Sequence, residues 1–193
     1  MNDNLKIRLI QTGDYSAVLN IYGPYVQNTA ISFEYDIPPL SEFSKRIENI
    51  TSFYPWLVAE IDNHIVGYAY ASKHRSRNAY DWSVESSVYL LENYHRMGIA
   101  KELYTKLFEP LRLQGIVNVY AGITLPNIKS ESFHAAMNFK PVGIYHKVGY
   151  KNNQWHDVLW MELALHQHNN NPPSPLSIEK IKALPEFTKT LIS

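Results

Sequence analysis

Regular alternation of apolar and polar residues marks the strands of this 193-residue chain. In residues 84–90, apolar Val84, Val88 and Leu90 alternate with polar Glu85 and Ser87. This alternation is typical of a strand with one buried face. Comparable patterns predict six further strands, at residues 5–10, 56–61, 65–72, 117–125, 139–150 and 155–165. Polar turns at residues 62–64 and 151–154 indicate that two pairs of these strands form hairpins.

Apolar residues four positions apart mark the longest helix, which follows strand 84–90. The pattern is carried by Ile99, Leu103, Leu107 and Leu111, with charged residues between them. Shorter patterns predict three more helices: one at residues 12–26 with Thr12 as its N-cap, one beginning at Ser41, and one at residues 130–137. Because strands, hairpins and helices alternate, we predict an α/β fold, with a mixed sheet and helices on both faces.

The join between strand 84–90 and the long helix is a short turn at residues 94–100. The first backbone N–H groups of a helix have no partner within it, and the helix dipole is positive there. Both features favour an anion such as phosphate, so we interpret residues 82–103 as a cofactor site. A dinucleotide-binding oxidoreductase is disfavoured because Gly98 stands alone, without the G-x-G-x-x-G spacing.

Composition and charge narrow the class of protein. The 18 Lys and Arg residues balance 18 Asp and Glu residues, so we expect neither a nucleic-acid partner nor a membrane partner. The absence of cysteine excludes disulfides, thiolate metal sites and a cysteine nucleophile. The histidines are scattered without ligand spacing, so we predict no metal site. There is no apolar signal-peptide core and no run near the ~18 residues of a membrane span, so we expect a cytoplasmic protein.

The character of the sequence changes after residue 165. Residues 166–175, HQHNNNPPSP, are polar and proline-rich, which is typical of a linker or a disordered tail. Residues 177–184 could form one short helix. We therefore predict one domain over residues 1–165, followed by a tail over residues 166–193.

Several segments resemble a known family. The turn reads His95-Arg96-Met97-Gly98-Ile99-Ala100, which is similar to the acetyl-CoA signature of the GNAT superfamily of N-acetyltransferases, with His95 where Gln or Arg is usual. YPWLVAE at 54–60, RNAYDWSVESSVY at 77–89, LPN at 125–127, FH at 133–134 and NQWHDV at 153–158 resemble the phosphinothricin and methionine sulfoximine acetyltransferases. Asn138 departs from the glycine usual there. The resemblance covers about residues 5–165.

The resemblance implies an activity as well as a fold. The fold would be the GNAT acyl-CoA N-acyltransferase fold, a twisted mixed sheet of about seven strands, and the assembly a homodimer. The reaction would be direct transfer of an acetyl group from acetyl-CoA, without a metal. The acceptor would be the amino group of a small amino acid analogue: phosphinothricin, methionine sulfoximine or methionine sulfone.

The resemblance also implies roles for individual residues. Glu85 would be the base that removes the amine proton, and His134 would assist it or line the pocket. The cofactor would be bound by Val88, Tyr89, Leu90, His95, Arg96, Met97, Gly98, Ile99, Ala100 and Asn127. Residues 88–90 would pair with the pantetheine arm and residues 95–100 would hold the pyrophosphate. The acceptor would be bound by Phe33, Arg75, Arg77 and Tyr80, because guanidinium groups suit carboxylate and phosphinate oxygens.

Simpler roles stay open for several of these residues. Glu85 could face solvent, His134 could be structural, Arg75 could be solvated, and residues 88–90 could pair in an ordinary sheet. Protonation of the leaving thiolate has three candidates that the sequence does not separate: Tyr145, Tyr150 and His156.

Other functions stay open as well. The same fold could acetylate another small amine or a protein N-terminus, or it could be a non-catalytic acetyl-CoA-binding module. A polycationic acceptor is disfavoured because Arg75 and Arg77 would repel it.

Overall fold

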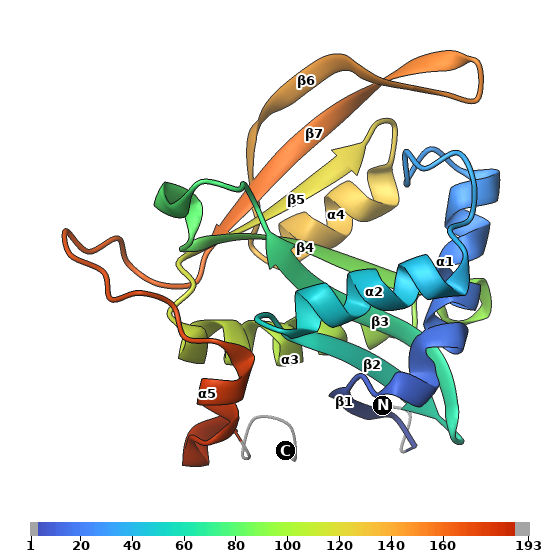
Figure 1. Ribbon diagram of the computed structural model, residues 1–193. Helices are drawn as coiled ribbons and strands as arrows, with labels where there is room; N and C mark the ends of the chain where they lie inside the picture. The colour runs from blue at the N-terminus through green and yellow to red at the C-terminus, as the bar shows by residue number, and fades with distance from the viewer. Residues whose placement is uncertain (1–3, 188–193) are drawn as a thin grey trace.

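The structure is a computed structural model that describes residues 4–187. Its centre is a seven-stranded sheet in the order β1-β2-β3-β4-β5-β7-β6 (Figure 1). The strands are β1 (Lys6–Leu9), β2 (Trp56–Ile61), β3 (His64–Lys73), β4 (Ser83–Leu90), β5 (Asn118–Thr124), β6 (Lys140–Lys151) and β7 (Gln154–Ala164). Only β4 and β5 run parallel; the other neighbouring strands are antiparallel. The predicted α/β class and mixed sheet are confirmed.

Helices cover both faces of this sheet (Figure 1). On one face, α1 (Tyr15–Asn28) and α2 (Leu40–Thr51) pack on Trp56, Val58 and Tyr68. On the other face, α3 (Ile99–Gln114) and α4 (Ile128–Ala136) pack on residues that alternate with these along the strands. The four residues of the predicted α3 stripe, Ile99, Leu103, Leu107 and Leu111, are all buried. The spacing therefore identified the core-facing side of the longest helix.

The helix starts differ from those predicted. Thr12 lies in a 3-10 turn, Thr12–Asp14, and α1 begins only after it. The turn is fixed by Asp14, which pairs with Arg8 at 2.6 Å and accepts the N–H of Gln11 at 2.8 Å. α2 begins one residue before Ser41. α4 begins two residues earlier than predicted because a capping residue stands ahead of it.

That capping residue is Asn127. Its Oδ1 accepts the backbone N–H of Ser130 at 3.1 Å, which satisfies one of the unpaired donors at the start of α4. We expect Asn127→Ala to destabilise the protein by about 1 kcal/mol, the usual cost of a lost N-cap. Thermal unfolding of the variant measures this, with Asn127→Asp as the control that retains an acceptor. Equal midpoints for Asn127→Ala and the unmodified protein would contradict the capping role.

β4 and β5 separate part of the way along their length. They pair at three positions, Ser83 with Asn118, Val84 with Val119 and Glu85 with Tyr120. Beyond Glu85, β4 continues to pair with β3 and β5 continues to pair with β7, but not with each other. The sheet therefore opens into a gap between β4 and β5 beside residues 86–90, where the two strands diverge (Figure 1).

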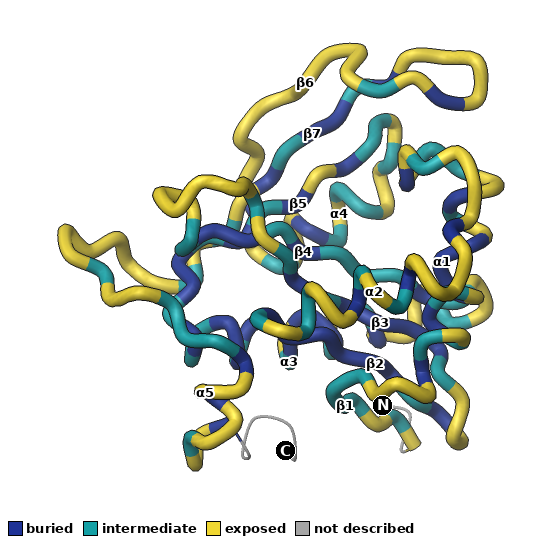
Figure 2. The backbone as a smooth tube through the Cα atoms, viewed as in Figure 1, coloured by how far each residue is buried: buried dark blue, intermediate teal, exposed yellow. Residues whose placement is uncertain are grey.

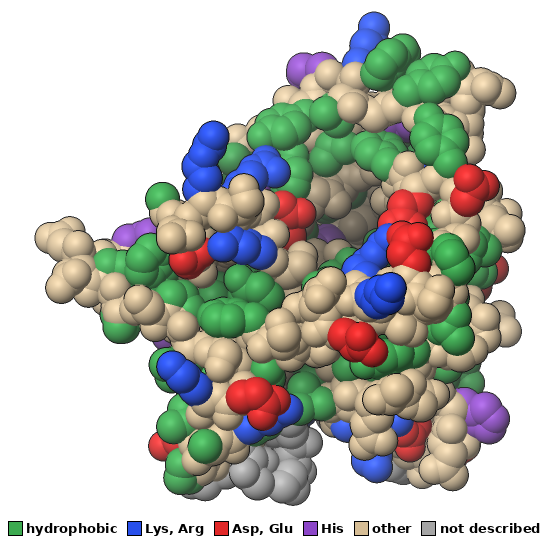
Figure 3. Space-filling model, viewed as in Figure 1, with side chains coloured by type: hydrophobic (Ala, Val, Ile, Leu, Met, Phe, Trp, Pro, Cys, Tyr) green, Lys and Arg blue, Asp and Glu red, His purple; other side chains and the backbone are tan. Residues whose placement is uncertain are grey.

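The β6–β7 hairpin arches away from the sheet and meets the segment that follows α1 (Figure 1). Nζ of the buried Lys151 donates to Val26 O at 2.6 Å and to Ser32 O at 2.7 Å. Phe33 lies so close to Gly149 that a Cβ there would be 2.3 Å from its ring. The hairpin and the segment thus pack together as one layer. Figure 3 shows a hollow in the molecular surface beneath the hairpin.

The segment after residue 165 was predicted to be a linker or disordered tail. Its polar part is exposed (Figure 2), but Trp82 Nε1 donates to Pro173 O at 2.7 Å. The short helix α5 (Ile178–Lys182) buries Ile178 and Ile181 against residues that include Leu9. Apolar residues at helical spacing thus hold its described part to the domain. Residues 188–193 of this tail, and residues 1–3, lie outside the described residues.

Candidate active site

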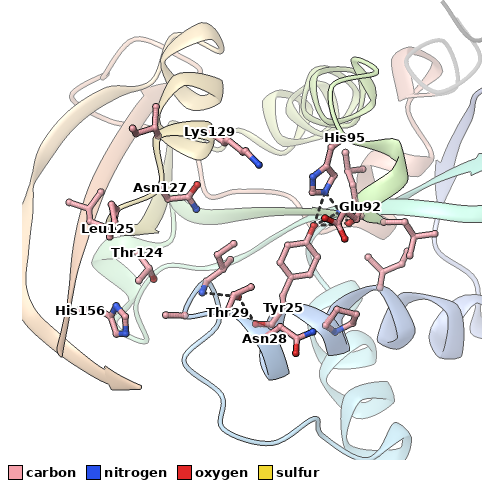
Figure 4. A pocket seen from close by; sticks show the side chains of 18 of the residues that line it. Tyr25, Asn28, Thr29, Glu92, His95, Thr124, Leu125, Asn127, Lys129 and His156 are labelled. Atoms are coloured by element: carbon pink, nitrogen blue, oxygen red, sulfur yellow. Dashed lines mark hydrogen bonds between the residues drawn. The ribbon is translucent and has the colours of Figure 1, made fainter. Parts of the chain in front are cut away.

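Two adjoining cavities occupy the gap between β4 and β5. The larger, about 1090 Å³, lies towards α1, and the smaller, about 570 Å³, lies towards the start of α3. Both are lined by Tyr25, Ile31, Leu90, His95, Asn127 and Lys129. Figure 4 shows Tyr25 pointing towards His95, with Asn127 and Lys129 across the cavity. The gap therefore accommodates an elongated ligand that runs from the sheet to the start of α3.

The backbone of β4 presents alternate residues to this gap. Leu91 N donates to Val66 O of β3 at 2.9 Å, and Tyr89 is paired with Tyr68 in the same register. Because hydrogen-bonding directions alternate along a strand, Val88 and Leu90 turn their N–H and C=O groups away from β3, towards the gap. Of the three residues predicted to pair with a cofactor, Tyr89 instead directs its backbone to β3.

Tyr25 of α1 partly covers this strand edge. Its hydroxyl donates to Leu90 O at 2.6 Å and lies 3.1 Å from Nε2 of His95. Desolvation by burial raises the pKa of Tyr25, so its hydroxyl stays protonated and keeps donating at neutral pH. Tyr25 was not among the predicted site residues, because helix spacing gives no sign that its hydroxyl reaches β4.

The predicted turn after β4 lies at the start of α3. Gly98 has φ +81°, which favours glycine, and a Cβ at this position would meet no atom within 4 Å. Glu102 N donates to Gly98 O at 3.1 Å, so the N–H groups of residues 99–101 precede the first bond of the helix. The smaller cavity is lined by His95, Arg96, Gly98, Ile99 and Ala100; Met97, half exposed, is not part of that lining.

His134 is buried beside the smaller cavity, on the α3 face of the sheet. Its Nδ1 lies 2.8 Å from Ser130 O and therefore carries the proton, so Nε2 accepts from Tyr104 OH at 3.3 Å. Tyr104 OH in turn accepts from Ser86 Oγ at 3.2 Å. Burial lowers the pKa of His134, so its ring is neutral at pH 7.

Glu85 lies on the opposite face from this chain of hydrogen bonds. Side chains alternate along β4, so Glu85 faces the α1–α2 side while Ser86 faces α3. The Glu85 side chain is 33% exposed, and its Oε1 lies 2.9 Å from Nδ1 of His74. His134 therefore lines the cavity without contacting Glu85. The partner of Glu85 is His74, a histidine that had no predicted role.

The four predicted acceptor-binding residues lie on two segments. Phe33 packs against the β6–β7 hairpin, with its ring centroid 6.1 Å from that of His156. Tyr80 lies in the β3–β4 loop with its ring centroid 5.9 Å from that of His74. Arg75 and Arg77 are exposed on the same loop, and neither lines the two cavities.

The three candidates for protonating a leaving group are also placed differently from one another. His156 is buried, lines the larger cavity and contacts Lys151 O through Nε2 at 3.0 Å. Tyr145 and Tyr150 are about half exposed on β6 and do not line that cavity. Position in the fold thus separates candidates that the sequence left equal.

Two further properties concern the described residues as a whole. Between residues 4 and 187, no group of three or more His, Cys, Asp or Glu side chains is arranged to hold a metal ion. Within the same range, no helix has the length and apolar character needed to span a membrane.

Comparison with known proteins connects this site to a family. Residues 7–160 match the acetyltransferase (GNAT) domain family. A phosphinothricin N-acetyltransferase of Streptomyces viridochromogenes is 37% identical over 154 residues, which cover 80% of this chain and 84% of that protein. A methionine sulfoximine and methionine sulfone acetyltransferase of Salmonella typhimurium is 27% identical, over 85% of this chain and 96% of its own.

A solved structure agrees with these sequence matches. The phosphinothricin acetyltransferase of Sinorhizobium meliloti, crystallised in complex with AcCoA, superposes with a TM-score of 0.85 at 29% identity, over 90% of this chain and 95% of that chain. The family match spans most of the described sheet and both cavities. The chain therefore belongs to the GNAT family of acetyltransferases.

Proposed function

We propose that this protein transfers the acetyl group of acetyl-CoA to the amino group of a small amino acid analogue: phosphinothricin, methionine sulfoximine or methionine sulfone. The observation that carries the proposal is the gap beside β4, which leads from an open strand edge to the start of α3. The names of the Streptomyces and Salmonella relatives support the acceptor class, and the Sinorhizobium complex supports acetyl-CoA.

The residues along the gap suit the parts of acetyl-CoA in order. The backbone groups of Val88 and Leu90 would pair with the amide groups of the pantetheine arm as an added strand does. A β4 N–H directed at the thioester carbonyl would stabilise the charge that develops there. The free N–H groups at the start of α3 would bind the pyrophosphate, with His95 and Arg96 at the rim. The amide group of Asn127 would donate to the arm.

Transfer requires a neutral amine and a leaving thiolate that gains a proton. Glu85 accepts a proton from the amine, directly or through a water, as the nitrogen attacks the thioester carbonyl. The carbon–sulfur bond then breaks, and the thiolate takes a proton from a nearby acid. His156 is the favoured acid for this step because it lines the larger cavity. His134, neutral and on the other face, would shape the pocket without assisting Glu85.

The acceptor would enter on the α1–α2 side of Glu85. Phe33 and Tyr80 would contact its carbon chain, and Arg75 and Arg77 would bind its carboxylate and its phosphinate or sulfoximine oxygens. Neither arginine forms an ion pair with a described residue, so both guanidinium groups are available to an anionic ligand. The same positive charge disfavours a polyamine.

The test is release of free thiol from acetyl-CoA when purified protein is given a panel of amines. We expect thiol release with phosphinothricin, methionine sulfoximine or methionine sulfone, and none with spermidine. Thiol release with peptide N-termini alone would indicate that the acceptor is a protein N-terminus. Binding of acetyl-CoA without turnover on any amine would indicate a non-catalytic module.

We propose further that two copies of the chain form a homodimer through β6. This edge strand and the start of β7 expose Val142, Ile144, Tyr145, Val148, Tyr150 and Trp155. A second copy of the chain would cover these exposed apolar side chains. Its own β6 would also pair with the unpaired edge of this β6.

Sedimentation velocity measures the assembly. We expect about twice the chain mass of 22.3 kDa, and a shift to the monomer for Ile144→Asp. Leu40→Asp is the control, because Leu40 on α2 is 44% exposed, like Ile144 at 43%. A monomer at micromolar concentration, or equal effects of the two variants, would contradict this interface.

The place of action follows from the co-substrate and the composition. We propose that the protein acts in the cytoplasm, where acetyl-CoA and free amino acids meet, and that its partners are small molecules. A formal net charge of zero supports this choice over nucleic acid or an anionic membrane.

A further inference from the structure

Among the described residues, His74 is the one side chain that forms a hydrogen bond with the carboxylate of Glu85. It follows the last residue of β3, and the β3–β4 register places Lys73 opposite Val84 and Ser72 opposite Glu85. Its backbone N–H donates to Ser83 O at 3.4 Å. The strand pairing therefore brings His74 beside Glu85, although eleven positions separate them.

The imidazole of His74 is held on several sides. Its ring stacks on Tyr120 with centroids 4.7 Å apart and the planes 23° apart. Trp160 and Tyr80 meet it edge to face, each with centroids 5.9 Å away. The His74 side chain is only 13% exposed. Packing of this kind fixes the direction of Nδ1, which points at Oε1 of Glu85 from 2.9 Å.

We propose that His74 is a positioning residue for Glu85. A carboxylate can only accept, so Nδ1 carries the proton and donates it to Oε1. One carboxylate oxygen is thereby occupied, and the other is oriented to receive the proton of the acceptor amine. The inference rests on the proposed function, since it concerns the base of that reaction. His74 acts through Glu85 and does not itself contact the acceptor.

Two substitutions separate the hydrogen bond from the packing of the ring. His74→Phe keeps a ring against Tyr120 and removes the donor. His74→Asn removes the ring but places an amide N–H near the position of Nδ1. We expect His74→Phe to lower kcat about 10- to 100-fold, the range for a lost bond to a charged group, with the KM for acetyl-CoA within about twofold. His74→Asn should retain at least about a third of kcat.

Comparison with Glu85→Gln tests whether His74 acts through Glu85. Once Glu85 is Gln, adding His74→Phe should cause no further loss of kcat, because the base that it positions is already gone. His64→Phe is the matched control, since His64 is exposed at the other end of β3 and, between residues 4 and 187, its Nδ1 contacts only Asp62 O. An active His74→Phe with an impaired His74→Asn, or additive losses in the double variant, would overturn the proposal.

The hydrogen bond between His74 and Glu85 can also be tested without measuring turnover. The ¹⁵N shifts of the His74 ring report which nitrogen carries the proton. We expect a protonated Nδ1 in the unmodified protein and a shift of the tautomer population towards Nε2 in Glu85→Ala. The same ring shifts in both proteins would overturn the proposal even if the enzyme were active. The expected shift in a protein that releases no thiol would leave the contact standing and refute the proposed function alone.

Discussion

Replacing Glu85 by Gln is expected to lower kcat by roughly 10²- to 10⁴-fold, the usual contribution of a general base. Gln has nearly the same shape, and its amide oxygen can still accept from His74, so the strand and its partner should stay in place. The amide cannot take the amine proton. Steady-state rates of thiol release measure the loss, and calorimetry should give an unchanged affinity for acetyl-CoA, because the cofactor gap lies beyond Glu85 along β4.

Glu48→Gln provides the control for this experiment. Glu48 is exposed on α2, and among the described residues its backbone oxygen, rather than its carboxylate, accepts hydrogen bonds, from Thr51 and Ser52. The same change of charge should therefore leave both kcat and acetyl-CoA affinity unaltered. Turnover by Glu85→Gln at the rate of the unmodified enzyme would remove Glu85 as the base.

Gly98→Val should weaken acetyl-CoA binding by at least about tenfold. At φ +81° a residue with a Cβ is strained, by about 1–2 kcal/mol, and a β-branched residue more so. Gly98 lines the smaller cavity, so we also expect the larger side chain to hinder ligand binding at the start of α3. Titration calorimetry with acetyl-CoA measures the affinity, and thermal unfolding measures the strain.

A glycine elsewhere in the chain shows whether the effect is specific. Gly13 also has open space around it but has no positive φ, so Gly13→Val should leave acetyl-CoA binding unchanged. Gly98→Ala carries the same backbone strain with a smaller side chain. It should therefore lower the unfolding midpoint but weaken acetyl-CoA binding less than Gly98→Val does. Normal binding by Gly98→Val would mean that the start of α3 does not hold the pyrophosphate.

The local elements of this fold could be predicted because their causes lie within a few residues. The stripe of Ile99, Leu103 and Leu107 is a property of one helix, and all three are buried. Turns with positive φ at Asn63 and Asn153 follow from residues that tolerate this conformation. The predicted helix starts were less accurate. Asn127 and Asp14 set them through hydrogen bonds to backbone N–H groups, which the spacing of apolar residues does not reveal.

The candidate site could be predicted only in part. The role of Glu85 was predicted from the family resemblance, and an anion site around Gly98 was predicted from the turn between a strand and a helix. The partners of these residues were not, because they come from distant segments: Tyr25 reaches Leu90 across 65 positions, and His74 reaches Glu85 from the preceding strand. The exposed positions of Arg75 and Arg77, outside both cavities, were also not evident from their charge.

By itself, the sequence determined the order of strands and helices, the buried side of α3 and the position of the turn before it. Each depends on interactions between near neighbours in the chain. Only the tertiary structure decided that β4 and β5 part after Glu85, that His134 and Glu85 lie on opposite faces, and that His74 holds the carboxylate. These features depend on which strands pair and how far, and strand pairing joins residues that no local pattern relates.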